Sequence, residues 1–356
     1  MRKYNICVLF GGISPEHEVS LRSAEAVLQH VDPEKYNVYP IGITQEGDWL
    51  LYGGDDYSAL PDGSWKEHPG NRKATISPIR GQGLLIFEGD CVVRALVDVV
   101  FPVLHGENGE DGAIQGLLQL AGIPYVGPNI AASAVSMDKT LTKLVMDHAG
   151  IPQAAWQLVK SRDLSQQMES ILDKIEQRFS YPVFVKPAGT GSSVGVSKAK
   201  DREALKSALD CAAQYGEKIL VEEFIDGKEV EVAVLGNSGP AASVCGEIDS
   251  GAEFYDYDAK YLTDSSVAYI PARIPNDIAE RVRELAVKAY CAIGCRGLSR
   301  VDFFVTHTDQ RIVFNEINTL PGFTSIAMYP KLFGASGIPF NELVDQLVTL
   351  ALEAYR

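Results

Sequence analysis

Short apolar runs alternate with amphipathic stretches along the first 130 residues of the chain. Residues 5–10, 37–43 and 97–103 have the length and composition of buried strands. The stretches 14–31 and 111–122 repeat apolar positions at helical spacing. Strands that alternate with helices predict an α/β fold with a parallel, Rossmann-like sheet.

The middle of the chain has a different pattern, which predicts a small α+β module. A new helix, 138–149, is expected soon after Gly127 and Pro128. The expected strands are 154–159, 181–186 and 218–224, and the expected helices lie near 163–178 and 201–214.

From Gly227 onward a third part begins. It has expected strands at 229–236, 298–305 and 311–317, and expected helices at 276–293 and 340–355. We therefore divide the chain into three domains, 1–137, 138–226 and 227–356.

The strand at 311–317 ends in an unusual way, in the sequence NEINTLPGF. Strict alternation places Ile312, Phe314, Glu316 and Asn318 on one face, and Val313 and Ile317 on the other. A carboxylate at the edge of a core is costly unless it has a charged partner, so Glu316 requires one.

Composition and charge narrow the possible functions. The chain has 356 residues, 46% of them hydrophobic, and a formal net charge of −15 without any basic run, which argues against nucleic acid as a partner. The apolar run in MRKYNICVLFGG is too short for a signal peptide, and no segment reaches the length of a membrane span. We expect a cytoplasmic protein with no membrane partner.

Two features indicate a phosphate site. The loop in VKPAGTGSSVGVSK, 185–198, is rich in Gly and Ser, so its backbone amides can approach phosphate oxygens beside Lys186. Lys139 starts a helix, where a cation is disfavoured unless an anion lies nearby. The alternatives are a flexible hairpin and a lysine that points into water.

A metal site is the candidate partner for Glu316. Asp302 lies two residues after Arg300 on one face of its strand, and it can meet Glu316 and Asn318 from a neighbouring antiparallel strand. Three oxygen ligands on adjacent strands suit Mg²⁺ that bridges a polyphosphate. The alternative is a core ion pair of Arg300 with Asp302 or Glu316.

Several further residues are open to two interpretations. Glu16 follows the Gly11–Gly12 turn and either faces a ligand or simply favours the start of a helix. His105 lies just past a parallel strand, where ligands bind in such sheets. Glu222 and Glu229 either accept hydrogen bonds from adenosine or are solvated strand ends. Residues 254–261 form either a lid or a surface hairpin.

Seven motifs in order along the whole chain resemble the D-alanine–D-alanine ligases of the ATP-grasp family. They are GGISPEHEVSL, HGENGEDG, MDK, VKPAGTGSSVGVSK, FYDYDAKY, SRVDFF and NEINTLPGFTS. The resemblance implies a Rossmann-like domain followed by an ATP-grasp fold of two α+β modules. It also implies a homodimer that ligates two D-alanines with ATP, through an acyl phosphate, for peptidoglycan precursor synthesis.

The resemblance further implies roles for individual residues. The ATP phosphates are expected to contact Lys139, Lys186, Ser192, Ser193 and Lys260. Adenosine is expected to contact Glu222, Glu223, Phe224, Ile225 and Glu229. Two Mg²⁺ or Mn²⁺ ions are expected on Asp302, Glu316 and Asn318. The first D-alanine and the lid are expected to be held by Glu16, Ser192 and Tyr261, with the oxyanion at Arg300 and the Gly322 amide and with His105 close by.

One departure leaves the second substrate open. Many relatives have a serine where this chain has Ala327, and that serine is expected to bind the carboxylate of the second substrate. D-alanyl-D-serine ligation is therefore the nearest alternative, whereas Tyr261 argues against lactate. A nucleotide-binding regulator without turnover is a third possibility, which the presence of Asp302 and Glu316 opposes.

Overall fold

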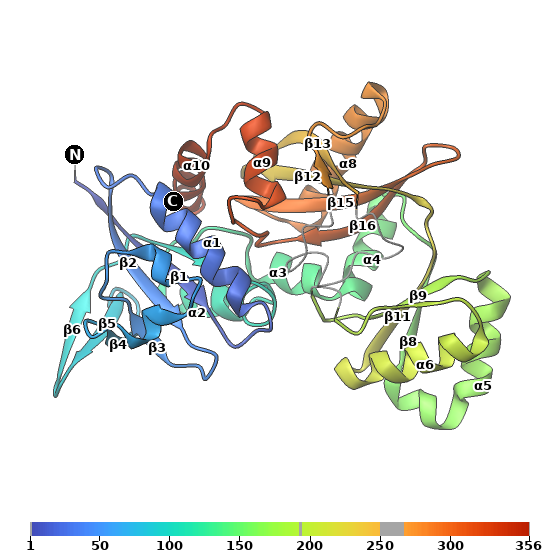
Figure 1. Ribbon diagram of the computed structural model, residues 1–356, viewed down its shortest axis with the longest axis horizontal. Helices are drawn as coiled ribbons and strands as arrows, with labels where there is room; N and C mark the ends of the chain where they lie inside the picture. Colours follow the sequence, from blue (N-terminus) through green and yellow to red (C-terminus); the bar gives the residue numbers. More distant parts are fainter. Residues whose placement is uncertain (1, 192–193, 250–266, 356) are drawn as a thin grey trace.

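The computed structural model describes residues 2–191, 194–249 and 267–355. Three sheets organise the chain, and Figure 1 shows the N-terminal sheet at the left and the central module at the lower right, with the C-terminal sheet above and between them. Among the residues with expected roles, Ser192, Ser193, Lys260 and Tyr261 lie outside the described residues, as does the segment 254–261.

The strands, in chain order, are β1 (Tyr4–Gly11), β2 (Tyr36–Ile43), β3 (Trp49–Leu51), β4 (Arg72–Ile76), β5 (Leu84–Glu88), β6 (Cys91–Ala95), β7 (Val99–Val103), β8 (Trp156–Lys160), β9 (Val183–Pro187), β10 (Ser197–Ala199), β11 (Lys218–Glu223), β12 (Gly227–Leu235), β13 (Ala241–Asp249), β14 (Val267–Tyr269), β15 (Leu298–Thr306) and β16 (Ile312–Asn318). The helices are α1 (His17–His30), α2 (Ala113–Ala121), α3 (Ile130–Met137), α4 (Lys139–Ala149), α5 (Ser161–Arg178), α6 (Arg202–Ala212), α8 (Asn276–Ile293), α9 (Met328–Ala335) and α10 (Phe340–Glu353). Short 3₁₀ helices cover Tyr57–Ala59, Ser64–Glu67 and Ala213–Tyr215.

The N-terminal sheet has the strand order β6-β5-β4-β3-β2-β1-β7. Its strands β2, β1 and β7 are parallel, which confirms the predicted parallel core. The antiparallel strands β3 to β6, which were not predicted, extend the sheet on one side. Side chains alternate along β1, so Val8 lies in the core on one face, which includes Leu347 of α10, and Leu9 lies in the core on the other face, which includes Leu118 of α2.

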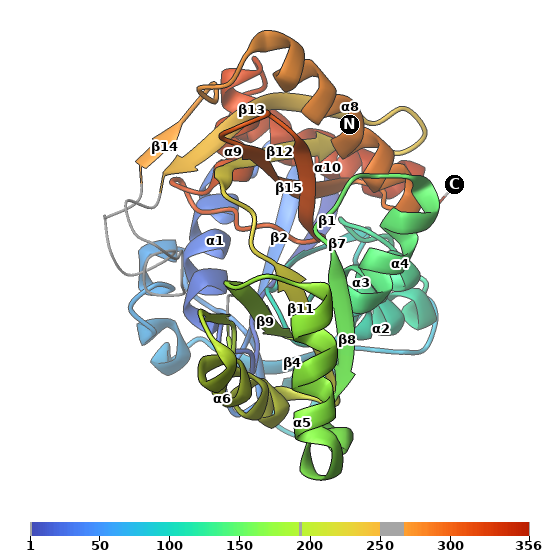
Figure 2. The ribbon, with the colours of Figure 1, turned by 90° about the vertical axis from the view of Figure 1, so that its right-hand side faces the viewer.

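Helices α5 and α6 cover one face of the central sheet, β10-β9-β11-β8. Val185 and Val221 pack with Leu172 of α5 and Leu209 of α6 in a single core. Figure 2 shows α5 and α6 lying over this sheet. Because side chains alternate along a strand, the residues next to these valines belong to the face away from α5 and α6. Lys186 and Glu222 are two of these residues.

The C-terminal sheet has the order β14-β13-β12-β15-β16, and α8 covers one face. The register shifts between Asp302 and Phe303, so Asn315 is an extra residue in β16. The prediction that Ile312 and Phe314 share a face with Glu316 was therefore wrong. Ile312, Phe314 and Ile317 lie in the core beneath α8, whereas Glu316 and Asn318 lie on the opposite face, directly across from Asp302 and Arg300.

Among the described residues, no helix combines the length and the apolar composition needed to cross a lipid bilayer.

Candidate active site

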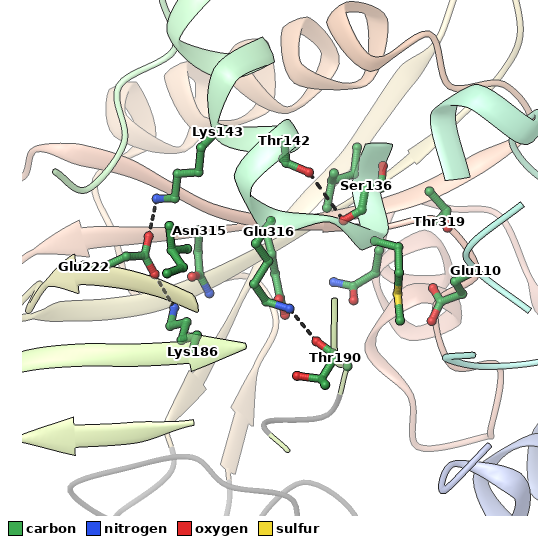
Figure 3. Close-up of a pocket in the computed structure, with 16 residues that line it drawn as sticks. Glu110, Ser136, Thr142, Lys143, Lys186, Thr190, Glu222, Asn315, Glu316 and Thr319 are labelled. Carbon is green, nitrogen blue, oxygen red and sulfur yellow. Dashed lines mark hydrogen bonds and ion pairs between the residues drawn. The ribbon is translucent and has the colours of Figure 1, made fainter. Parts of the chain in front are cut away.

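A pocket lies between α3, α4, the open face of the central sheet and the end of β16 (Figure 3). It brings together five residues for which the sequence suggested roles: Lys139, Lys186, Glu222, Glu316 and Asn318. These residues come from the central module and the C-terminal sheet, so the pocket depends on the docking of the two.

The start of α4 holds the glycine-rich loop. The Asp138 carboxylate caps this helix by accepting hydrogen bonds from the backbone N–H groups of Thr140 at 3.0 Å and Leu141 at 3.2 Å. The Lys139 backbone N–H donates to the Ala188 carbonyl at 2.9 Å, and its Nζ donates to the Thr190 carbonyl at 2.5 Å. The lysine at the positive end of this helix therefore lies beside the loop that is expected to bind phosphate.

A buried ion triad forms one wall of the pocket. The Glu222 carboxylate lies 2.7 Å from Lys186 Nζ and also pairs with Lys143 Nζ, and Figure 3 shows it between the two lysines. Burial alone raises the pKa of Glu222, but the charges of Lys186 and Lys143 outweigh it and lower the pKa to about 2. Two cations on one carboxylate leave an excess positive charge at the pocket wall.

A row of three carboxylates crosses the C-terminal sheet near the pocket. Glu231, Asp302 and Glu316 are direct cross-strand partners on β12, β15 and β16, so their side chains share a face. Arg300 donates to both Asp302 oxygens at 2.8 and 2.7 Å, and its Nε lies 3.1 Å from Glu231. Asn318 donates to Asp302 at 2.9 Å.

Arg300 is not the only cation near this row, because Glu316 lies close enough to Lys186 for its charge to raise the pKa of that lysine. Among the described residues, no three His, Cys, Asp or Glu side chains are grouped closely enough to hold a metal ion by themselves. The expected set of Asp302, Glu316 and Asn318 instead combines two carboxylates with one amide. The Arg300–Asp302 ion pair that was considered as an alternative is present in the structure. The oxygen-rich face suits a hard cation even so.

Glu16 lies where the N-terminal part meets the glycine-rich loop. An added Cβ at Gly106 would lie 2.3 Å from Glu16 Oε2, and one at Gly191 would lie 3.1 Å from the same oxygen. The Glu16 side chain makes no capping hydrogen bond at the start of α1. Helix capping therefore does not explain the position of this carboxylate, which lies beside Gly191.

His105 and Glu110 both bind the loop that follows β16. His105 Nδ1 donates to the Leu320 carbonyl at 2.9 Å, and Glu110 accepts from the Leu320 N–H at 3.0 Å. Burial lowers the pKa of His105, which is therefore neutral. Glu110 is half-buried at the pocket edge. Its pKa is raised to about 7, mainly because its carboxyl group is shielded from water and also because the charge of Glu16 lies nearby.

Four described residues that are expected to contact adenosine do not line the pocket: Glu223, Phe224, Ile225 and Glu229. Glu223 accepts from the Ala155 N–H at 2.9 Å, and Ile225 packs with Val313 in a small core. Phe224 stacks on Phe184 with ring centroids 6.1 Å apart. Glu229 lies close enough to Lys186 for its charge to raise the pKa of that lysine.

Three residues of the site were missed by sequence reasoning. Lys143 follows Lys139 by one helical turn, which places both on one face of α4, and that spacing was the available signal. Glu231 lies at alternate spacing from Glu229 on β12. Glu110 is part of the HGENGEDG motif, yet only the fold brings it to Leu320.

Family models match most of the chain. The model described as D-ala D-ala ligase N-terminus matches residues 5–128, and the one described as D-ala D-ala ligase C-terminus matches residues 145–349. The chain belongs to the D-alanine–D-alanine ligase family. Members of this family are ATP-dependent ligases with the ATP-grasp fold, so the predicted fold class and enzyme class are confirmed.

Individual relatives are similar to this chain along nearly their full length. The D-alanine–D-alanine ligase of Acetivibrio thermocellus is 49% identical, with 99% of this chain and 97% of the relative covered, and that of Caldicellulosiruptor bescii is 48% identical, with 100% and 97% covered. Among solved structures, the VanG D-Ala:D-Ser ligase from Enterococcus faecalis has a TM-score of 0.89 at 39% identity, covering 98% of this chain and 100% of that one. The D-alanine–D-alanine ligase from Coxiella burnetii has a TM-score of 0.83 at 36% identity, covering 99% and 96%.

Proposed function

We propose that this chain ligates two D-alanine molecules to D-alanyl-D-alanine with ATP, for peptidoglycan precursor synthesis. The observation that supports it most is the pocket, which Lys139, Lys186, Glu316 and Asn318 line together in a chain of this family. Cationic and acidic side chains in one pocket suit a metal-bound polyphosphate. Use of ATP fits the expected cytoplasmic location.

The phosphates of the nucleotide occupy this pocket in our proposal. Lys139 and Lys186 bind the phosphates, together with the loop that contains Ser192 and Ser193, and Lys260 binds the γ-phosphate. The excess positive charge of the Lys143–Glu222–Lys186 triad attracts these oxygens. Adenosine contacts Glu222, Glu229 and the backbone of Glu223, Phe224 and Ile225.

Two Mg²⁺ or Mn²⁺ ions would be held by Asp302, Glu316 and Asn318. When bound, such ions neutralise charge on the transferred phosphoryl group. Glu231 lies in the same carboxylate row, where it shares Arg300 with Asp302 and keeps the row oriented. The experiment that tests this assignment is a calorimetric titration of Mg²⁺ with ATP into the protein and into a Glu316→Gln variant.

Glu16, Ser192 and Tyr261 hold the first D-alanine, whose carboxylate attacks the γ-phosphate to give an acyl phosphate and ADP. The amine of the second D-alanine then attacks the acyl carbon. Arg300 and the Gly322 N–H stabilise the oxyanion of this step, since fixed donors in a dry site are worth more than donors in water. His105 donates a hydrogen bond to the Leu320 carbonyl of the same loop.

D-serine is the second candidate for the second substrate. A Cβ added at Gly322 would lie 3.6 Å from the Ala327 methyl group, so the residue that replaces the serine of many relatives adjoins the proposed oxyanion amide. The neighbour VanG is a D-Ala:D-Ser ligase. The curated relatives with higher identity are D-alanine–D-alanine ligases, which favours D-alanine here.

A competition experiment separates these substrates. The protein is incubated with ATP, Mg²⁺ and equal D-alanine, D-serine and D-lactate, and products are identified by mass. D-alanyl-D-alanine is the expected main product. D-alanyl-D-serine in excess would overturn the substrate assignment, and no ADP above background would favour the nucleotide-binding regulator.

We also propose that the chain consists of three domains. The domains 1–137, 138–226 and 227–356 contain one sheet each. Met146 of α4 nevertheless packs in the core of the C-terminal sheet, so this helix links the last two domains. We expect a homodimer, which sedimentation in solution would test.

A further inference from the structure

The loop that follows β16 is held at both ends by side chains of the N-terminal part. At its start, Glu110 Oε1 accepts the Leu320 N–H at 3.0 Å, and His105 Nδ1 donates to the Leu320 carbonyl at 2.9 Å. At its end, Ser23 Oγ accepts the Phe323 N–H at 3.1 Å. We call Ser23, His105 and Glu110 the loop clip.

The clip residues also fix each other. Because His105 Nδ1 donates to a carbonyl and the ring is neutral, Nε2 accepts, and the Ser23 hydroxyl lies 3.1 Å from it as the donor. The second oxygen of Glu110 accepts the Gly106 N–H at 2.9 Å. Ser23 is fully buried and His105 is 5% exposed, so water does not compete for the hydrogen bonds of these two residues.

One backbone N–H of this loop, that of Gly322, is not used by the clip. The N–H groups of Leu320 and Phe323 are both used, and Pro321 has none. The Gly322 N–H has no hydrogen-bond partner among the residues that the structure describes. Since Gly322 lies between two fixed residues, the direction of its N–H is fixed as well.

We propose that Ser23, His105 and Glu110 are positioning residues that hold the Gly322 N–H where it donates to the reacting carbonyl oxygen. The proposal rests on the proposed function, in which Gly322 and Arg300 receive the oxyanion. Glu110 also lines the pocket proposed for the nucleotide, but the role proposed here for all three residues is not a contact with D-alanine. They act through the backbone of the loop.

The step that depends on this donor is the second one. The amine nitrogen of the second D-alanine forms a bond to the acyl carbon, and the carbonyl electron pair moves onto its oxygen. The bond between the acyl carbon and the phosphate oxygen then breaks, inorganic phosphate leaves, and the nitrogen gives a proton to it. The first step, phosphoryl transfer to the carboxylate, creates no such oxyanion.

Loosening the clip therefore slows ligation more than phosphorylation. Removal of one oxyanion donor costs about 100–1,000-fold in kcat, and displacement of the donor costs less, so we expect about 10–100-fold. The acyl phosphate then persists and is hydrolysed by water. ADP is released without dipeptide.

Two variants test this, with a matched control on the same helix. Ser23→Ala removes one end of the clip, and Glu110→Gln replaces an acceptor at the other end at constant shape. Ser20→Ala is the control, because Ser20 is also fully buried on α1 and also makes two hydrogen bonds, from Gly11 N–H and to the Val103 carbonyl, but does not touch the loop. ADP and dipeptide are measured in one reaction, with KM for ATP and a thermal unfolding curve for each protein.

For the wild type and Ser20→Ala, we expect one dipeptide per ADP. For Ser23→Ala and Glu110→Gln, we expect ADP to exceed dipeptide at least about twofold. In these two variants kcat for dipeptide formation should fall, whereas KM for ATP should change less than about threefold. If Ser23→Ala does not fold, Glu110→Gln decides. An unchanged ratio in the folded variants, or an equal excess in Ser20→Ala, would overturn the clip. A wild type that makes no ADP with D-alanine would instead refute the proposed function.

Discussion

Replacing Glu222 by Gln tests the buried triad. The variant keeps the shape of the side chain but leaves Lys143, which is 3% exposed, and Lys186 without their shared anion. The fall of the Glu222 pKa from 4.5 to about 2 is worth about 3 kcal/mol at 1.36 kcal/mol per pH unit. Removal of one partner of a buried ion pair costs about 3–5 kcal/mol, so we expect the variant to lose that much at pH 7.

The sign of the pH dependence follows from the lowered pKa. A carboxyl group whose pKa is lower in the folded state contributes stability above its unfolded pKa, and loses it as pH falls through the folded pKa. The difference between wild type and Glu222→Gln is therefore full at pH 7 and shrinks between about pH 4.5 and pH 2.

Urea unfolding measures this difference in the free energy of unfolding, at a series of pH values from 7 down to the lowest at which the wild type is still folded. The control is Glu176→Gln, which breaks an ion pair with Arg202 whose side chains are 31% and 34% exposed, and it is expected to cost less than about 1 kcal/mol. Equal losses for the two variants, or a Glu222→Gln difference that does not shrink below about pH 4.5, would refute the buried triad as a source of stability.

Three further predictions concern the rest of the site. Because the pKa of Glu110 is raised in the folded state, its contribution to the free energy of unfolding is complete below about pH 4.5 and is lost as pH rises through about 7. Glu110→Gln should therefore remove this part of the pH dependence of the free energy of unfolding. The same pH dependence in the variant as in the wild type would contradict this. Glu316→Gln should lower turnover by at least about 100-fold with an unchanged circular dichroism spectrum, and near-normal activity would exclude the metal role. Gly106→Ala, at φ +66° and 2.3 Å from Glu16 Oε2, should raise KM for D-alanine at least about tenfold and cost about 1–2 kcal/mol, whereas a normal KM would separate Glu16 from substrate binding.

Strong periodicity explains which elements the sequence predicted well. The helix expected at 276–293 is α8 (Asn276–Ile293), because its apolar repeat is uninterrupted. Strands β3 and β14 have three residues each, too few for an alternating pattern to show. The bulge at Asn315 could not be predicted either, because it depends on how β16 pairs with β15 rather than on the residues of β16.

Candidate site residues could be predicted where their partners lie on neighbouring strands close in the sequence. Asp302, Glu316 and Asn318 could be paired because two adjacent strands supply them. Lys143 and Glu110 were missed because their partners, Glu222 and Leu320, lie far away in the chain. Packing of separate sheets brings them together, and no periodic pattern encodes it.

Transfer of oxygen from D-alanine to phosphate tests most directly whether this chain activates a carboxylate as an acyl phosphate. The protein is incubated with ATP, Mg²⁺ and D-alanine labelled with ¹⁸O in its carboxylate, and the inorganic phosphate released is analysed by mass. One ¹⁸O atom in each phosphate is expected, since the carboxylate oxygen that attacks the γ-phosphate leaves with it. Phosphate released without label, while dipeptide forms, would contradict an acyl phosphate intermediate.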